Sequence, residues 1–313
     1  MSGEAAFHRQ LRAMVTDPAA RGLLDDVALF PTEGEQLVLT SDTMVEGMHY
    51  RPDDPPETVG WKLAAVNLSD LAAKGAFPRA CLLNHALTGD AAWDAGFLDG
   101  LGRAMKSYGL PLIGGDTVAL PAGAPRVSSL TAIGSVPAGQ RVPGRGGARP
   151  GDRLYLSGPV GDSGAGLAML AAGLADPPEL IRAYRVPVPH LSIGQTIAPD
   201  AHAMMDVSDG LLIDAARLAE ASGCGLLIVD IPLSPHYAAL RGESVAARLA
   251  AATAGDDYVL LIALPNDRTT PPGLIPIGHC RAGEGLALRL DGRAVPLPAR
   301  LGYEHGAERG DRH

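Results

Sequence analysis

The sequence predicts an α/β protein, of mixed α/β and α+β character, with two domains. The chain has 313 residues, which is enough for one large or two medium domains. Apolar residues make up 46% of it, as expected for a packed globular protein. Short apolar runs of strand length alternate with longer segments of helical periodicity along both halves of the chain.

The first half alternates between predicted helices and strands. Residues 4–15 have the pattern of a short amphipathic helix, and Gln36–Thr40 that of a strand ending at Ser41 and Asp42. Two prolines precede a predicted helix over about 57–74, which Gly75 ends. The other predicted elements are a strand over 80–87, a helix over 91–108, a buried strand over 110–113 and a strand over 126–136.

A segment rich in Pro, Gly and Arg, residues 137–152, predicts the domain boundary. We assign residues 1–137 to an N-terminal domain, 138–152 to a linker and 153–313 to a C-terminal domain. The second domain is predicted to contain strands over 153–156, 203–206, 225–231 and 258–264, helices over 163–172 and 211–222, a proline-punctuated helical segment over 178–198, and short strands at its end. Between the strand over 225–231 and about residue 254, the sequence shows no clear pattern of helix or strand.

Composition excludes several classes of protein. The formal charge of −9 and the lack of a basic stripe argue against binding to nucleic acid or to an anionic membrane surface. Cys81, Cys224 and Cys280 are widely separated, so a disulfide framework or a zinc site is not expected. No apolar run has the length of a membrane span or a signal peptide. We therefore expect a cytoplasmic protein.

Carboxylates occur in short polar islands at the ends of apolar runs or inside helices. Carboxylates brought together in a cleft repel one another unless cations neutralise them, and clusters of oxygen ligands select Mg²⁺. The islands predict a site for several magnesium ions and a polyphosphate. They are Asp25-Asp26, Ser41-Asp42-Thr43, Asn67 to Asp70, Gly114-Gly115-Asp116-Thr117, Asp206 to Gly210 and Gly255-Asp256-Asp257.

Some of these positions have simple local explanations and others do not. Ser208 is a candidate helix N-cap and Asp209 lies in the first turn, but capping does not explain Asp206. Asn67 and Asp70 share a helix face with Lys74 inside an apolar segment, which favours a stripe facing a cleft over a solvated one.

Two further patterns leave alternatives open. Adjacent side chains on a strand point to opposite sides, so at most one of Asp256 and Asp257 need face the site. The glycine-rich segment Gly158–Gly166 follows a strand and opens a helix, so it is either a phosphate-binding turn or a tight strand-to-helix turn. No P-loop or protein-kinase motif occurs in the chain.

The islands, taken in order, resemble the thiamine-monophosphate kinase family. This family belongs to the superfamily of aminoimidazole ribonucleotide synthetase and selenophosphate synthetase. The phrases that carry the resemblance run in one order over nearly the whole chain. They are SDTMVEGMHY (41–50), GWKLAAVNLSDLAAKGAFP (60–78), LIGGDT (112–117), GARPGD (147–152), DVSDGL (206–211), AGDDYVLL (254–261) and GYEH (302–305).

The resemblance implies ATP-dependent phosphorylation of thiamine monophosphate to thiamine diphosphate, with several Mg²⁺ ions as cofactors. It also implies a homodimer formed through the N-terminal sheet, and Asp42, Asp70 and Asp209 as catalytic residues. The implied metal ligands are Asp26, Thr40, Ser41, Asp42, Asp70, Asp116, Asp206 and Asp209. The implied ATP contacts are Gly115, Asp116, Arg141, Ser208 and Tyr108, and the implied substrate contacts are His49, Asp256 and Tyr303.

Three departures from the family pattern accompany these assignments. Leu23 and Leu24 stand where the family has glycine before the first acid pair, Asp256 replaces a glutamate, and Gly306 replaces a phenylalanine. Two alternatives therefore stay open: another ATP-dependent enzyme of the same superfamily, and a non-catalytic nucleotide-binding relative. Selenophosphate synthetase fits less well, because it would need a reactive cysteine near the N-terminus and none precedes Cys81.

Overall fold

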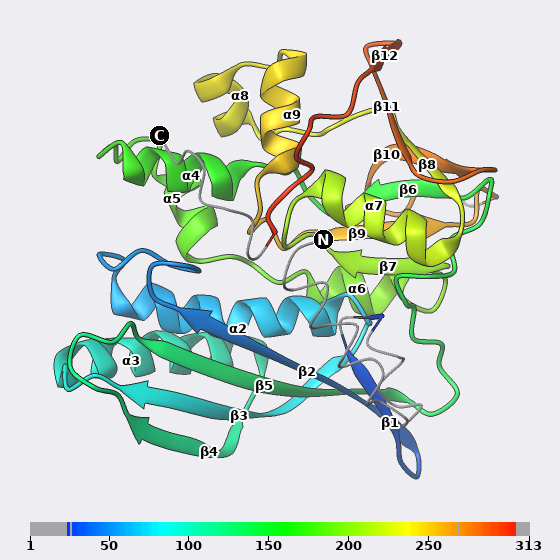
Figure 1. Ribbon diagram of the computed structural model, residues 1–313. Helices are drawn as coiled ribbons and strands as arrows, with labels where there is room; N and C mark the ends of the chain where they lie inside the picture. Colours follow the sequence, from blue (N-terminus) through cyan, green and yellow to red (C-terminus); the bar gives the residue numbers. More distant parts are fainter. Residues whose placement is uncertain (1–23, 26, 268–269, 305–313) are drawn as a thin grey trace.

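The computed structural model describes residues 24–25, 27–267 and 270–304. These residues form two layered units, each built on one β-sheet, as Figure 1 shows. The α/β fold class predicted from the sequence is therefore confirmed. The predicted helix over 4–15 lies outside the described residues.

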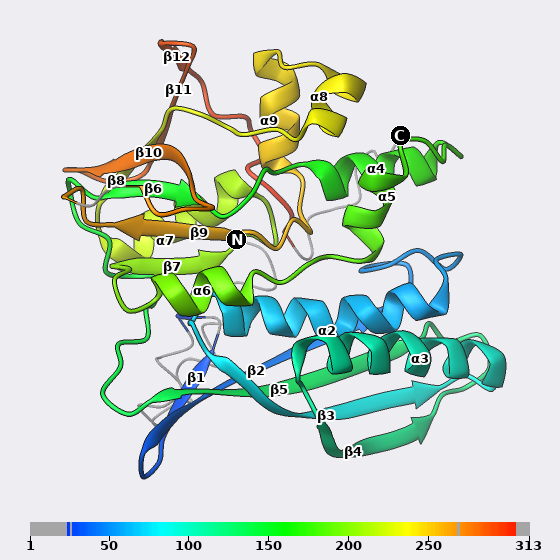
Figure 2. The same ribbon diagram turned by 180° about the vertical axis from the view of Figure 1, so that it is seen from behind.

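The N-terminal unit contains a five-stranded sheet in the order β1-β2-β5-β3-β4. All neighbouring strands are antiparallel except β3 and β4, which are parallel. Figures 1 and 2 show the two helices of this unit, α2 and α3, on the same face of the sheet. The elements are β1 (Ala28–Pro31), β2 (Glu35–Val45), α2 (Pro56–Ala72), β3 (Phe77–Leu87), α3 (Ala91–Tyr108), β4 (Leu112–Ala119) and β5 (Val127–Pro137).

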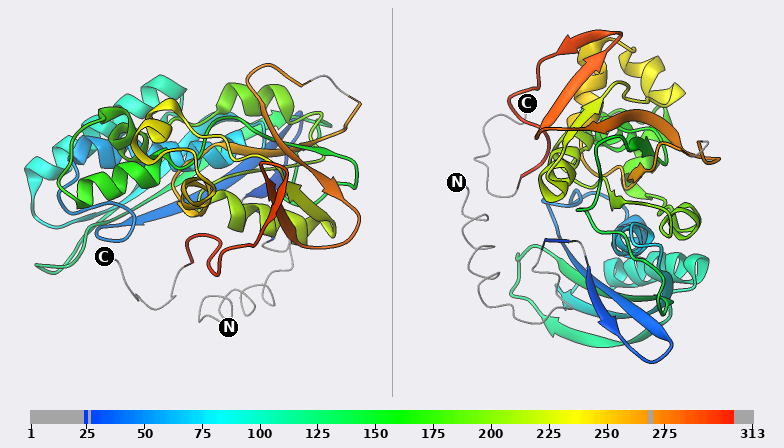
Figure 3. Two further views of the ribbon diagram at one scale, coloured as in Figure 1. Left: turned by 90° about the horizontal axis from the view of Figure 1, so that it is seen from above. Right: turned by 90° about the vertical axis from the view of Figure 1, so that its right-hand side faces the viewer.

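The C-terminal unit contains a seven-stranded sheet in the order β12-β11-β8-β10-β6-β9-β7. Its strands are β6 (Arg153–Leu156), β7 (Ala203–Asp206), β8 (Gly225–Ile228), β9 (Leu260–Leu264), β10 (Ile275–Arg281), β11 (Leu286–Leu290) and β12 (Arg293–Val295). Its helices are α4 (Asp162–Ala171), α5 (Pro178–Arg185), α6 (Leu191–Ile197), α7 (Leu211–Ser222), α8 (Pro235–Arg241) and α9 (Val245–Thr253). Figure 3 shows the two units stacked along one direction.

Helix α2 lies between the two sheets and packs on both sides. Its buried Leu63 and Leu71 belong to the same apolar cluster as Tyr155 and Ile262 of the C-terminal sheet. Figure 2 shows α6 in the space between α2 and β7. The approach of α6 is close, because a Cβ on Gly194 would stand 1.9 Å from a carbonyl oxygen of α2. Residues on α2 are thus placed within reach of both units.

Local sequence explains why α2 and α3 form where they do. Pro56 occupies the first turn of α2, where its missing N–H costs nothing. The Asp90 side chain caps α3 by accepting the N–H of Trp93, and Gly109 ends α3 in the left-handed conformation. Gly100 lets the helices touch, since a Cβ there would stand 1.7 Å from the Glu57 carbonyl oxygen.

Several predicted elements are confirmed, and some predicted boundaries are wrong. The strand over 203–206 and the helices over 91–108 and 211–222 have the expected bounds. The predicted end of the strand at Ser41 is wrong, because β2 continues to Val45. The strand predicted to end at Ile113 likewise continues through the glycines as β4, and it is an exposed edge strand rather than the buried strand predicted. The poorly marked stretch before residue 254 forms α8 and α9.

Candidate functional site

Helix α2 carries polar side chains that contact β2 on one side. Asp70 Oδ2 accepts a hydrogen bond from Thr40 Oγ1 at 2.5 Å. Asn67 Oδ1 accepts the Asp42 N–H at 3.2 Å, while its Nδ2 donates to the Leu63 carbonyl at 2.9 Å. Asn67 is fully buried, so this face of α2 is not a solvated stripe. The structure thus brings together Thr40, Asp42 and Asp70, as the sequence predicts.

Ser69, which lies between Asn67 and Asp70 on α2, contacts the C-terminal unit. Ser69 Oγ donates to Asp206 Oδ2 at 2.7 Å, and both residues are buried. Asp206 is the last residue of β7. A hydroxyl that donates to a carboxylate forms a charge-assisted bond, which is stronger than a bond between neutral groups. Ser69 therefore fixes Asp206 next to the Asp70 turn of α2.

The turn between β7 and α7 is organised by two residues that the sequence prediction did not select. The buried Asp214 Oδ2 accepts the N–H groups of Ser208 and Asp209, each at 3.1 Å. Arg217 Nη1 lies 2.6 Å from Asp209 Oδ2 and 2.8 Å from Asp214 Oδ1. Burial raises the pKa of the Asp214 carboxyl to about 7. Arg217 therefore partly neutralises the carboxylate of Asp209.

The adjacent acids Asp256 and Asp257 point in different directions. Asp256 Oδ2 accepts from Lys62 Nζ at 2.9 Å, which ties it to α2. Both oxygens of Asp257 lie 2.9 Å from the Gly161 nitrogen at the start of α4. Burial raises the pKa of Asp257 well above its usual value, against the lowering effect of the Gly161 N–H. The group that accepts the N–H at the glycine-rich turn is thus a side chain of the chain itself.

The loop that follows β2 carries His49 and is fixed at both ends. His49 Nδ1 accepts the Val45 N–H at 3.0 Å, and its carbonyl accepts Lys62 Nζ at 3.2 Å. At the far end of the loop, Asp54 Oδ1 accepts from Arg185 Nε of α5 at 2.7 Å. The loop therefore contacts both α2 and the C-terminal unit.

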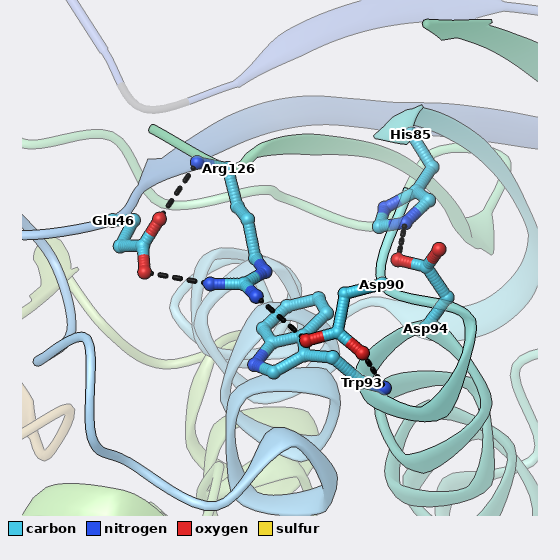
Figure 4. A network of polar contacts seen from close by, with 6 residues as sticks. All are labelled: Glu46, His85, Asp90, Trp93, Asp94 and Arg126. Carbon is cyan, nitrogen blue, oxygen red and sulfur yellow. Dashed lines mark hydrogen bonds and ion pairs between the residues drawn. The ribbon is translucent and has the colours of Figure 1, made fainter. Parts of the chain in front are cut away.

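A polar network holds the first residue after β2, as Figure 4 shows. Arg126 donates to Glu46 Oε1 at 2.7 Å through Nη1, and to Glu46 Oε2 at 3.0 Å through its backbone N–H. Its guanidinium also lies 3.2 Å from Asp90 and stacks on Trp93, 4.5 Å from the ring centroid. Nearby, the buried His85 lies 3.1 Å from Asp94. This network anchors the start of the His49 loop.

Tyr303 approaches the same region from the end of the described chain. Its N–H donates to the Asp209 carbonyl oxygen at 2.9 Å. The neighbouring Gly302 packs so closely that a Cβ there would stand 2.5 Å from the same oxygen. The C-terminal segment therefore lies against the turn that contains Ser208 and Asp209.

The structure does not bring the Ser41 side chain to this group. Because β2 continues past Ser41, side chains alternate, and Thr40 and Asp42 face α2 while Ser41 faces the opposite side. Ser41 Oγ there lies 2.9 Å from Thr131 Oγ1. Within a single chain, the Ser41 side chain therefore does not join those of Thr40 and Asp42.

Gly115 and Asp116 lie on the exposed edge strand β4, away from Asp42. Three strand spacings separate β2 from β4, which amounts to about 14 Å. Asp116 is aligned with Asn84, Ser129 and Thr43 across the sheet, so its side chain shares the face that α2 does not cover. Its Oδ1 accepts the Thr117 N–H at 2.9 Å. The sequence predicted a strand that ends before these residues, whereas pairing with β3 continues β4 through them.

Two further predicted residues have other surroundings. Arg141 Nη2 donates to the His202 carbonyl at 2.8 Å, which fixes it against the C-terminal unit. Tyr108, at the end of α3, packs edge-on against Trp61 of α2 with centroids 5.8 Å apart, and burial raises its pKa. Asp26 lies outside the described residues.

Within the described part of the chain, no three His, Cys, Asp or Glu side chains are grouped closely enough to hold a metal ion. The carboxylates instead have partners in the protein: Thr40 for Asp70, Ser69 for Asp206, and Arg217 for Asp209. In the same described residues, none of the helices has the length and apolar character needed to span a bilayer.

Comparison with known proteins identifies the family. The family models for AIR synthase related protein match residues 24–136 with the N-terminal domain and 149–267 with the C-terminal domain. The thiamine-monophosphate kinase of Caulobacter vibrioides is 37% identical, covering 93% of this chain and 86% of the relative. That of Escherichia coli K12 is 38% identical, covering 91% and 92%. The chain belongs to the thiamine-monophosphate kinase family.

Solved structures of this family have the same fold. The structure described as AaThiL complexed with AMPPCP and TMP has a TM-score of 0.85 and 31% identity, covering 97% of both chains. The thiamine-monophosphate kinase of Stenotrophomonas maltophilia has a TM-score of 0.76 and 32% identity, covering 91% of this chain and 95% of that one. The resemblance seen in the sequence is thereby confirmed.

Sequence reasoning missed residues that hold the site together. Lys62, Asp214 and Tyr258 each bind a predicted site residue or its backbone. A signal was present, because Lys62 and Asp214 interrupt apolar helical segments, as Asp70 does. The signal for Tyr258 was weaker, since a tyrosine in an apolar run is an ordinary core residue.

Proposed function

We propose that this chain catalyses ATP-dependent phosphorylation of thiamine monophosphate to thiamine diphosphate. The observation that carries this proposal is the match, over 97% of both chains, to a family member complexed with AMPPCP, an ATP analogue, and TMP. The site around α2 supports it, since Thr40, Asp42, Asp70 and Asp206 are brought together there from both units.

The proposed residue roles follow the family resemblance. His49, Asp256 and Tyr303 contact the acceptor, and the loop of His49 and the segment of Asp256 meet at Lys62. Gly115, Asp116, Arg141, Ser208 and Tyr108 contact ATP. The proposed metal ligands are Asp26, Thr40, Ser41, Asp42, Asp70, Asp116, Asp206 and Asp209. Ser41 would contribute its backbone carbonyl, because its side chain bonds Thr131 on the other face.

The donor set suits magnesium. Every proposed ligand supplies oxygen, which is the preference of Mg²⁺. Mg²⁺ commonly uses one or two carboxylates and completes its shell with water and substrate phosphates, so a preformed group of three acids is not required. When bound, the ions would neutralise part of the negative charge of the two phosphate groups.

The chain's own residues bind and orient the reactants. The acceptor is a phosphate oxygen that is already anionic near neutral pH, so no strong general base is needed. What the reaction needs is alignment of two anionic groups, which positioning residues supply. Asn67 holds the backbone of Asp42, Ser69 holds the Asp206 carboxylate, and Asp214 holds the Ser208 turn.

We extend the proposal to a homodimer in which a second copy completes the site. Leu112, Ile113 and Val118 of the edge strand β4 are about half exposed, which is unfavourable for apolar side chains unless another surface covers them. Within one chain, Asp116 shares neither the sheet face nor the strand of Asp42. We propose that a second copy covers these apolar side chains of β4 and contributes its Asp116 to the first copy's site.

Complementation tests this arrangement. Asp42→Asn and Asp116→Asn proteins, each nearly inactive alone, should regain part of the activity when unfolded together, refolded and compared with each variant refolded alone. Recovery supports a site shared between copies. If the mixture is as inactive as its parts, each chain builds its site alone.

The direct test of function is to mix the protein with ATP, Mg²⁺ and thiamine monophosphate and to measure thiamine diphosphate and ADP. Formation of both products in equal amounts supports the proposal. Nucleotide binding by calorimetry without turnover would favour a non-catalytic relative. Turnover of ATP with a different acceptor in a substrate screen would favour another enzyme of the superfamily.

A further inference from the structure

Lys62 is a buried lysine to which the proposed function assigns no role. Its side chain is 3% exposed, although lysine is almost never fully buried in proteins unless it is paired. It lies near the middle of α2, among the apolar residues that pack between the two units. A cation in this position requires partners, and those partners indicate its role.

The Lys62 ammonium contacts three separate segments of the chain. It donates to Asp256 Oδ2 at 2.9 Å and to the His49 carbonyl at 3.2 Å. It also lies 4.2 Å from the ring centroid of Tyr184, on α5, in a cation–π arrangement. The first two partners come from the N- and C-terminal units, and both are proposed acceptor contacts. Lys62 is therefore the group that joins them.

The backbone conformation and hydrogen bonds of the segment around Asp256 hold its carboxylate against Lys62. Asp256 has a φ of 68° and Tyr258 a φ of 54°, which are left-handed conformations uncommon outside glycine. The Asp256 N–H is held by the Ser208 carbonyl at 2.7 Å, and the Tyr258 hydroxyl donates to Asp256 Oδ1 at 2.8 Å. Each carboxylate oxygen of Asp256 thus has its own donor.

The charge of Lys62 matters because other acids lie nearby. Burial is the main cause that raises the pKa of Tyr258, and the charges of Asp256, Asp42 and Asp206 raise it further. Of these carboxylates, Asp256 is the one that contacts Lys62 directly. Lys62 is buried, whereas the Asp256 side chain is 31% exposed, so removing the cation leaves a carboxylate that water compensates only in part.

We infer that Lys62 is a positioning residue for the phosphoryl acceptor, which holds His49 and Asp256 at a fixed separation across the two units. The inference rests on the proposed function, which makes those two residues the acceptor contacts. Asp256, which is one methylene shorter than the glutamate of the family pattern, forms an ion pair with Lys62. His49 and Asp256, which both contact Lys62 of α2, then bind the acceptor together.

Steady-state kinetics with each substrate varied separately tests this inference. Lys62→Met should raise the KM for thiamine monophosphate at least tenfold, or about 1.4 kcal/mol. The KM for ATP should change less than twofold, because Lys62 contacts none of the proposed ATP ligands. Lys62→Arg, which keeps the charge, should recover part of the loss. Lys106→Met, an exposed lysine on α3, is the matched control and should leave both constants unchanged.

A double-mutant cycle distinguishes action through Asp256 from a general structural effect. In an Asp256→Asn background, Lys62→Met should raise the acceptor KM much less than it does in the wild type. An equal effect in both backgrounds, or an unchanged acceptor KM, would overturn the inference. If Lys62→Met does not fold by circular dichroism, Lys62→Gln, which is polar but uncharged, replaces it, with the same expected rise and the same cycle. A wild-type protein without turnover would instead refute the proposed function.

Discussion

Replacing Ser69 with alanine removes a single hydroxyl from the contact between α2 and the C-terminal unit. Ser69 Oγ donates to Asp206 Oδ2 at 2.7 Å, and the two residues are 0% and 4% exposed. Alanine fits the same space without its oxygen, so the change leaves the packing of the helix almost unaltered. Its effect therefore reports on the bond itself.

The size of the effect follows from the burial of the carboxylate. A hydrogen bond to a charged group contributes about 1.5–3 kcal/mol to stability. For a domain of this size, each kcal/mol corresponds to about 2–4 °C in the melting temperature. Ser69→Ala should thus lower the melting temperature by roughly 3–12 °C. Without this hydrogen bond the Asp206 carboxylate is no longer held in one position, which should lower turnover by about tenfold, or ~1.4 kcal/mol.

Thermal unfolding followed by circular dichroism, together with the kinase assay, measures both effects. Ser107→Ala is a matched control, because Ser107 Oγ donates to the Arg103 carbonyl at 2.9 Å on the exposed face of α3. Surface changes of this kind alter stability by less than about 0.5 kcal/mol. The reasoning is refuted if the two alanine variants have the same melting temperature and the same turnover.

Two other predictions concern the carboxylates. Asp42→Asn and Asp70→Asn should each reduce turnover at least a hundredfold, or about 2.7 kcal/mol. Both variants should keep a native circular dichroism spectrum. Unchanged turnover in both would contradict the metal-site assignment. Asp257→Asn should remove a pH dependence of stability. Because burial raises the pKa of Asp257, the unfolded chain ionises this carboxyl first, so the wild type loses stability relative to the variant as pH rises above about 4. A difference in melting temperature that stays constant between pH 4 and 7 would contradict that assignment.

Local sequence patterns predicted much of the fold, for reasons visible in the structure. Helix α7 and strand β7 have clear apolar periodicity with defined ends, and their predicted bounds are confirmed. The islands at Ser41 and Gly115 were expected to end strands, because polar and glycine residues commonly do so. In the structure, pairing with β5 and β3 carries both strands through these residues.

The same extension explains what the sequence could not place in the site. Once β2 continues through Ser41, alternation decides which side chains face α2, and it separates Ser41 from Thr40 and Asp42. Contacts between distant segments, such as Lys62 with Asp256 and Ser69 with Asp206, depend on how the two units pack. No local pattern encodes them, although the polar residues inside apolar helices marked where to look.

The reaction itself is the most direct test of the proposed function. The folded protein with ATP, Mg²⁺ and thiamine monophosphate should yield thiamine diphosphate and ADP in equal amounts, with no product when Mg²⁺ is removed by EDTA. ATP binding without thiamine diphosphate formation, in a sample folded by circular dichroism, would contradict the proposed function.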